Sequence, residues 1–176
     1  GAATLAGVAP AMAAADVPRK WDKTVDVVVV GYGGAGAVTA ITAHDLGASA
    51  IVLERSDQVG GVTALSMGEV WVAGNHYAAA KGIEDSVDSG YRYLKRLSMD
   101  YGSDLAILNV VAHAREALAY FEEKIGLKMA VIASCPDYYY TVTNDAVAEG
   151  RMLEVVPFDG ATLGDWQAKT RLSPQM

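Results

Sequence analysis

The segment 31–36 reads GYGGAG, and its residue types and spacing suit phosphate binding. Gly31 permits a tight turn, Gly33 lets the backbone approach a pyrophosphate group, and Gly36 lets a helix pack close to a preceding strand. The first N–H groups of that helix and the positive end of its dipole then point at the phosphates. The spacing therefore predicts a loop that holds a nucleotide through its pyrophosphate.

The residues around this loop predict the elements that position it. The β-branched run Val25–Val30 is typical of a strand buried on both faces of a parallel sheet, and Ala37–Leu46 has helical spacing and stops at Gly47. A second strand, Ala50–Leu53, ends in Glu54, whose carboxylate can accept hydrogen bonds from an adenosine ribose. A glycine motif alone is weak evidence. Its place between a strand and a helix, with an acid after the next strand, favours a dinucleotide site over a structural turn.

A second glycine pair at 60–61, shortly after this acid, helps to distinguish between dinucleotides. Such a pair brings further backbone N–H groups to a long ligand, and Thr63 and Ser66 add hydroxyl groups. A nicotinamide-binding fold usually continues with another helix and strand here, so the pattern favours a flavin. An ordinary surface turn is one alternative. A nicotinamide-dependent reductase is another, but its Tyr-x-x-x-Lys spacing, at 91–95, comes too early and follows the wrong strands.

Residues 25–74 resemble the FAD-binding segment of the fumarate reductase and ketosteroid dehydrogenase flavoproteins. The resemblance is carried by Glu-Arg at 54–55, Gly-Gly-x-Thr-Ala-x-Ser at 60–66 and Val-Trp-x-x-Gly at 70–74. It implies FAD as the cofactor, with the flavin end near 63–68. The residues that the resemblance implies for FAD binding are Gly31, Gly33, Gly34, Ala35, Gly36, Glu54, Arg55, Gly60, Gly61, Thr63, Ala64, Ser66 and Gly68.

A run of tyrosines at 138–140 follows a strand expected at Leu127–Ala133. A phenol can donate a hydrogen bond, or exchange a proton when its neighbours lower its pKa, so this run is a candidate for catalysis. Aromatic rings that cover the core, or one ring packed against a flavin, are the alternatives.

The tyrosine run carries a second resemblance. Pro-Asp-Tyr-Tyr at 136–139, Gly-Arg at 150–151 and an acidic Pro-Phe stretch at 154–158 resemble the ketosteroid dehydrogenase branch of the family. In that branch the first tyrosine of the pair lines the steroid pocket and assists proton removal while the flavin takes a hydride from the neighbouring carbon. The resemblance therefore implies a catalytic role for Tyr138. Residues 140–149 depart from the pattern.

Composition limits the class of protein. The chain has 176 residues, 52% of them hydrophobic, and a net charge of −7, which suits a sizeable core and opposes nucleic acid binding. Cys135 is the single cysteine, and His44, His76 and His113 share no metal-binding spacing. No metal site and no nucleic acid partner are therefore expected.

The expected fold class is α/β: a partial Rossmann-like FAD-binding fold with a parallel sheet and flanking helices. Two amphipathic helices should follow the cofactor segment, one capped by Asp85 or Ser86 and one running from a cap at Ser103 to Gly126. Their apolar faces are expected to pack the core and not to touch substrate. Residues 25–176 are expected to form the N-terminal portion of an FAD-binding domain that is incomplete at its C-terminus.

The start of the chain predicts a location. Residues 1–15 are small and apolar, and the Ala-x-Ala spacings at 11–13 and 13–15 match the end of an export signal. An export-signal remnant followed by a linker at 16–24 implies the cell envelope or periplasm. An Ala-rich leader or a short core helix, in a cytoplasmic protein, are the alternatives. A bilayer requires roughly 20 apolar residues, so no membrane span is expected.

These observations favour an FAD-dependent oxidoreductase that removes or adds hydrogens across a carbon–carbon bond next to a carbonyl. The expected substrate is steroid-like, and the electron partner is not identified. A fumarate-reductase-like enzyme acting on a small unsaturated acid is an alternative, although the mid-chain arginines that it would need do not cluster in the sequence. A non-catalytic dinucleotide-binding module is another. Alone, these residues are expected to bind FAD weakly or not at all and to lack activity.

Overall fold

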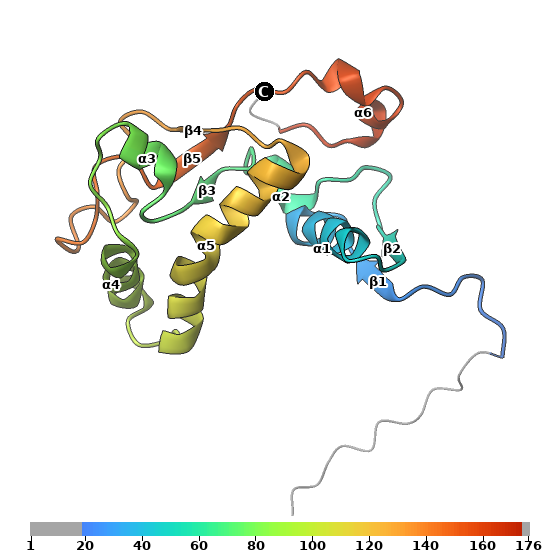
Figure 1. Cartoon of the computed structure of the whole chain (residues 1–176), viewed down its shortest axis with the longest axis horizontal. Helices are drawn as coiled ribbons and strands as arrows, with labels where there is room; N and C mark the ends of the chain where they lie inside the picture. The colour runs from blue at the N-terminus through green and yellow to red at the C-terminus, as the bar shows by residue number, and fades with distance from the viewer. Residues whose placement is uncertain (1–18, 174–176) are drawn as a thin grey trace, which may run out of the picture.

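The computed structural model describes residues 19–173, which form an α/β arrangement of short strands and longer helices (Figure 1). The expected export signal at 1–15 and the first part of the linker lie outside these residues and stay predictions. The elements are β1 (Val27–Val30), α1 (Gly34–Asp45), β2 (Ala50–Leu53), α2 (Gly61–Leu65), β3 (Val70–Trp71), α3 (His76–Ala80), α4 (Val87–Ser98), α5 (Asp104–Ile125), β4 (Met129–Val131), β5 (Met152–Val155), a 3₁₀ turn (Gly160–Leu163) and α6 (Trp166–Lys169).

The predicted strand–helix–strand unit is present. β1 and β2 pair in parallel from Val27 with Ala50 to Val30 with Leu53, and α1 connects them. Val29 is buried, whereas its neighbours Val28 and Val30 are exposed, so the expectation of a strand buried on both faces is wrong for the described residues. Alternate strand residues face opposite sides of a sheet, and only one side is covered here. This alternation shows that α1 covers one face and that the other face is open among the described residues.

A second sheet carries the main hydrophobic cluster; its strand β4 lies within the strand expected at Leu127–Ala133, whereas its pairing with β3 and β5 was not predicted. Its strand order is β3-β5-β4, and both pairings are antiparallel. α5 packs across it, and the cluster between them comprises Val72, Leu118, Met129, Val131 and Leu153. The expectation of a parallel sheet therefore holds for β1 and β2, while β3, β5 and β4 form a separate antiparallel sheet.

The two predicted amphipathic helices are confirmed, with one correction to their packing. The Ser86 hydroxyl caps α4 by accepting a hydrogen bond from Ser89 N–H at 3.1 Å, and α5 starts after Ser103 and stops at Gly126. Leu118 in the second half of α5 is buried, but Leu105 in the first half is 66% exposed. The first half extends past the sheet and lies beside α4 alone (Figure 1), so it has less to pack against.

The last described segment returns to the glycine-rich end of the fold. Val59 N–H donates to the Lys169 carbonyl at 2.7 Å and Arg171 N–H donates to the Val59 carbonyl at 2.9 Å, so the chain around Thr170 runs parallel to Val59. This pairing places residues 170–173 beside the second glycine pair. None of the helices between residues 19 and 173 combines the length and hydrophobicity needed to cross a bilayer.

Candidate functional site

The first glycine loop lies at the carboxyl ends of the parallel strands. Gly31 has a φ of +94°, in the region that favours glycine, and its N–H donates to the Leu53 carbonyl at 2.7 Å. A Cβ on Gly36 would lie 2.0 Å from the Gly31 carbonyl oxygen. Tight turning at Gly31 and close approach at Gly36 therefore bring the start of α1 onto the end of β1, as the sequence predicted.

The start of α1 can receive an anion. Gly33 precedes the helix without a side-chain cap, and its first turn holds no acidic residue. Gly34 N–H donates to the Thr63 hydroxyl at 3.0 Å. Within the described part of the chain, the next two N–H groups, of Ala35 and Gly36, have no acceptor. Unpaired amides at the positive end of a helix dipole are suited to phosphate.

Glu54 is directed at the glycine loop. Its carboxylate accepts hydrogen bonds from Tyr32 N–H at 2.6 Å and from Ser56 N–H at 2.8 Å. The hydrogen bond from Ser56, and after it that from Tyr32, lower the pKa of Glu54, so this carboxylate is charged at neutral pH. Each oxygen has a further lone pair, which leaves acceptor capacity for ribose hydroxyls.

The second glycine pair packs directly against the first loop. Gly60 N–H donates to the Tyr32 carbonyl at 2.8 Å, and a Cβ on Gly61 would lie 3.0 Å from the Gly33 Cα. Both residues have positive φ, +118° for Gly60 and +54° for Gly61. The close approach of the two loops therefore depends on glycine at these positions.

The two loops open onto a cleft of ≈ 640 Å³. Of the residues predicted to bind the cofactor, the structure places Gly33, Gly34, Gly60, Thr63, Ala64 and Gly68 on its wall. It places Gly31, Ala35, Gly36, Glu54, Arg55, Gly61 and Ser66 outside that wall. Several of these seven shape the loops instead of facing the cleft. The Ser66 hydroxyl, for example, donates to the Thr63 carbonyl at 3.0 Å, and Arg55 is exposed.

Part of the cleft wall was not predicted from the sequence. Residues 154–158, which belong to the acidic Pro-Phe stretch of the steroid resemblance, line the cleft together with residues 170–173. Arg171 belongs to this second segment, and its guanidinium donates to the Ser56 hydroxyl at 3.3 Å. No local pattern marks Arg171, because it reaches the site only through pairing with Val59.

Tyr138 does not line this cleft. Its side chain is 78% exposed and lies on the loop that follows β4, next to α4. The structure of residues 19–173 therefore does not bring Tyr138 and the glycine loops together. Its catalytic role stays a prediction.

A buried ionic network beside Tyr138 was also missed. Arg151 is 1% exposed and pairs with Asp85 at 2.6 Å and Asp137 at 2.8 Å. Its guanidinium lies over the rings of Trp71 and Tyr93, at 5.3 and 5.5 Å from their centres. Asp137 belongs to the Pro-Asp-Tyr-Tyr motif and Arg151 to the Gly-Arg motif. Both motifs resemble the ketosteroid dehydrogenase branch, and this shared resemblance was the only sign in the sequence that the two residues are paired.

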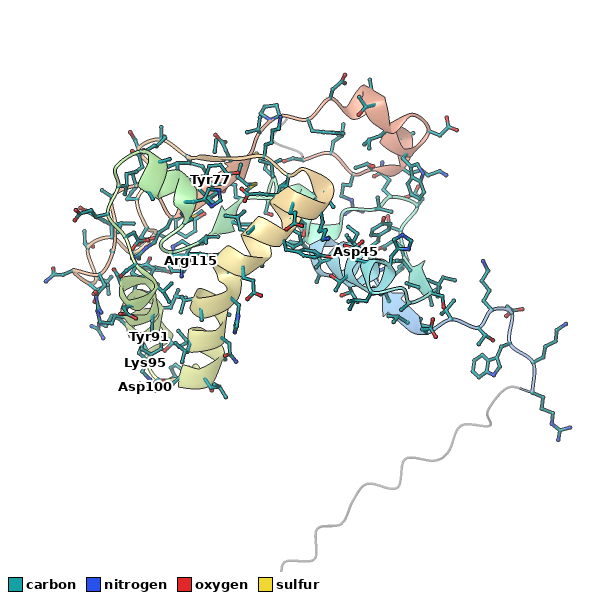
Figure 2. All side chains as sticks on the ribbon, in the orientation of Figure 1. Asp45, Tyr77, Tyr91, Lys95, Asp100 and Arg115 are labelled. Carbon is teal, nitrogen blue, oxygen red and sulfur yellow. The ribbon has the colours of Figure 1, made fainter. Side chains whose placement is uncertain are left out.

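The Tyr-x-x-x-Lys segment at 91–95, on which the nicotinamide alternative depends, lies away from the cleft. Figure 2 shows Tyr91 and Lys95 on α4, close to the turn that leads into α5. The Lys95 amine pairs with Asp104 at 2.6 Å and with Asp100 at 2.9 Å. Neither Tyr91 nor Lys95 lines the cleft, so this arrangement offers no hydride site there.

Comparisons with known proteins agree with this geometry. The family model described as "FAD binding domain" matches residues 26–176. The 4-oxocyclohexanecarboxylate 2-dehydrogenase of Sinomonas cyclohexanicum is 33% identical over 131 residues, 74% of this chain and 23% of that protein. The 3-oxosteroid 1-dehydrogenase of Mycolicibacterium smegmatis is 35% identical over 139 residues, 79% of this chain and 24% of that protein.

A solved structure is also similar. It is the 3-ketosteroid delta1-dehydrogenase from Sterolibacterium denitrificans, in complex with 1,4-androstadiene-3,17-dione. The match has a TM-score of 0.75 and 34% identity, and covers 85% of this chain and 26% of that one. The chain thus spans about a quarter of the length of these three proteins.

Proposed function

Since the chain belongs to the FAD-binding domain family, we propose that it supplies the nucleotide-binding part of an oxidoreductase acting on a carbon–carbon bond next to a carbonyl. FAD is the cofactor of this family. The observation that carries the proposal is the cleft whose wall combines Gly33 and Gly34, at the start of α1, with apolar residues at 155–158. The backbone at the start of α1 suits a charged pyrophosphate, and the apolar side chains suit a ring.

The described residues fit FAD. The amides of Ala35 and Gly36 would hold the pyrophosphate, and Glu54 would accept hydrogen bonds from the ribose. The isoalloxazine ring would lie toward residues 63–68, whose backbone turns at Gly68 with a φ of +72°. When bound, FAD supplies the hydride-accepting centre of the reaction.

The substrate class that we propose is a ring ketone, in particular a 3-ketosteroid. The similar proteins named above are dehydrogenases of cyclic ketones, and the apolar wall of the cleft contains Val155, Val156 and Phe158. In this proposal Tyr138, as the phenolate, accepts the proton removed from the carbon next to the carbonyl and then, as the phenol, releases it to solvent. The high exposure of Tyr138 is consistent with proton release to water.

The cleft gives less support to a small dicarboxylate as substrate. Two carboxylates require cationic partners, and Arg171 is the only cationic side chain on the described cleft wall, which also holds Glu69 and Glu154. A non-catalytic binding module would not change its flavin absorbance with substrate. Bleaching of the flavin absorbance by a reductant, followed by its return on addition of an enone, would exclude that module.

We predict that Glu54→Gln weakens FAD binding by about ten- to a hundred-fold, the scale of one or two charge-assisted hydrogen bonds. Glutamine offers a single acceptor oxygen, so the Tyr32 or Ser56 amide loses its partner and the ribose loses a charged acceptor. Quenching of flavin fluorescence in a titration measures the effect. Asp57→Asn, at a nearby exposed carboxylate, should bind FAD as the unchanged protein does. Equal affinity for Glu54→Gln would contradict the ribose assignment.

We predict that Tyr138→Phe lowers turnover of a 3-ketosteroid by about a hundred-fold or more, as expected for loss of a general acid or base. FAD content should not change, because Tyr138 does not line the cleft. Steady-state rates with an artificial electron acceptor measure this effect, and Tyr140→Phe is the matched control. Full turnover by Tyr138→Phe would remove the catalytic assignment. Absence of turnover in the unchanged holoenzyme would remove the substrate proposal.

A further inference from the structure

The loop that carries Tyr138 is held at both ends by one buried carboxylate. Asp137 is 2% exposed and accepts hydrogen bonds from Trp71 Nε1–H at 2.7 Å and from Val147 N–H at 3.0 Å. The Asp137 N–H in turn donates to the Val147 carbonyl at 3.0 Å. These contacts close residues 137–147 into a loop whose ends are fixed to each other.

A second contact fixes the backbone on the other side of Tyr138. The Tyr93 hydroxyl on α4 accepts a hydrogen bond from Tyr139 N–H at 3.2 Å. The Tyr93 ring is 3% exposed and stacks on Trp71 with centres 5.9 Å apart. The residue before Tyr138 and the residue after it are therefore both bonded to buried side chains.

Arg151 joins these two anchors. Its guanidinium donates to Asp137 at 2.8 Å, to the Ser89 hydroxyl at 2.8 Å and to both oxygens of Asp85 at 2.6 and 2.9 Å. Among the described residues, no buried side-chain nitrogen or oxygen lacks a hydrogen-bond partner. A buried ionic network of this kind is weak evidence for extra stability, since desolvation offsets the attraction, but here it bonds Arg151 to Asp137, Ser89 and Asp85 at once. That arrangement fixes the backbone on both sides of a side chain that is itself exposed.

We propose that Tyr93 and Arg151 are positioning residues that hold Tyr138 in the place from which it exchanges a proton. Tyr93 acts on the backbone of Tyr139, and Arg151 acts on Asp137. Neither touches substrate or cofactor in this scheme. The inference rests on the proposed function for the identity of the reaction, while the position of the loop can be tested without that reaction.

The test uses Tyr93→Phe, which removes one hydroxyl and keeps the ring that stacks on Trp71. Tyr91→Phe is the control, because Tyr91 is on the same helix and is not bonded to the loop. In the holoenzyme, hydrogen exchange at the Tyr139 amide should become at least about five-fold faster in Tyr93→Phe, the scale of one net hydrogen bond, and stay unchanged in Tyr91→Phe. Turnover of a 3-ketosteroid should fall about ten-fold, with KM and FAD content unchanged.

A second pair of variants tests Arg151. Arg151→Lys keeps the charge and should retain part of the turnover, whereas Arg151→Met should lose both the turnover and the protection of amides in residues 137–147. Unchanged Tyr139 exchange in Tyr93→Phe would overturn the inference. So would faster exchange with normal turnover, because the anchor would then be structural only. If the unchanged holoenzyme turns over no 3-ketosteroid, the proposed function fails, and the exchange data alone decide whether these residues fix the Tyr138 segment.

Discussion

Replacing Gly36 with alanine is expected to abolish FAD binding and to lower the free energy of unfolding by about 3–5 kcal/mol, the range of severe backbone conflicts. The new Cβ would lie 2.0 Å from the Gly31 carbonyl oxygen, and that atom belongs to the backbone of the turn. Relief of the contact requires α1 to move away from β1, which also moves the amides that we propose hold the pyrophosphate. FAD affinity should fall more than about a hundred-fold. Urea denaturation and flavin titration measure the two effects.

Gly33→Ala provides the matched control for stability. A Cβ at Gly33 would meet its nearest atoms, the Gly60 carbonyl oxygen and the Gly61 Cα, at 3.9 Å, and the φ of −88° suits alanine. The fold should therefore keep its stability, while a methyl group on the cleft wall still hinders FAD. If Gly36→Ala unfolded at the same urea concentration as Gly33→Ala, the inference that α1 packs too closely on β1 for a side chain at position 36 would be contradicted.

Replacing Arg151 with methionine is expected to destabilise the protein by about 3–5 kcal/mol, the usual effect of removing one partner from a buried ion pair. Methionine leaves the buried carboxylates of Asp85 and Asp137 without a cation. Urea denaturation at neutral pH measures the loss. Arg92→Met breaks the exposed ion pair with Asp145 and should leave stability close to that of the unchanged protein. If Arg151→Met and Arg92→Met lowered the free energy of unfolding equally, the larger effect expected for the buried ion pair would be contradicted.

The effect of Arg151→Met should depend on pH. Burial of Asp85 disfavours its charged form, but hydrogen bonds from Arg151 and from Gly74 N–H outweigh burial, so the pKa of Asp85 lies below its ordinary value. A lowered carboxyl pKa stabilises the fold above the unfolded-state pKa of about 4, and this contribution is lost as pH falls through the folded-state pKa. In Arg151→Met, protonation of Asp85 neutralises a buried carboxylate that has lost its cation, so acid removes part of the destabilisation. The difference in unfolding free energy between the unchanged protein and Arg151→Met should therefore become smaller as the pH is lowered.

The sequence by itself determined the features that depend on neighbouring residues. The glycines at 31–36 specify a turn and a close helix contact, and the run of β-branched residues before them specifies a strand. Ser86 and Gly126 mark helix ends because capping involves atoms within a few residues of them. Glu54 was placed correctly beside the loop, since the end of one parallel strand lies next to the end of its neighbour.

Only the tertiary structure decided which distant segments meet. The antiparallel sheet of β3, β4 and β5, the pairing of Thr170 with Val59, and the contact of Arg151 with Asp85 each join residues far apart in the chain. Alternation and helical spacing show which face of a segment is apolar, but they do not identify its partner. A buried arginine therefore has the same local signature as a surface one. Burial and counter-charges distinguish it, and both arise when the separate layers of the fold pack together.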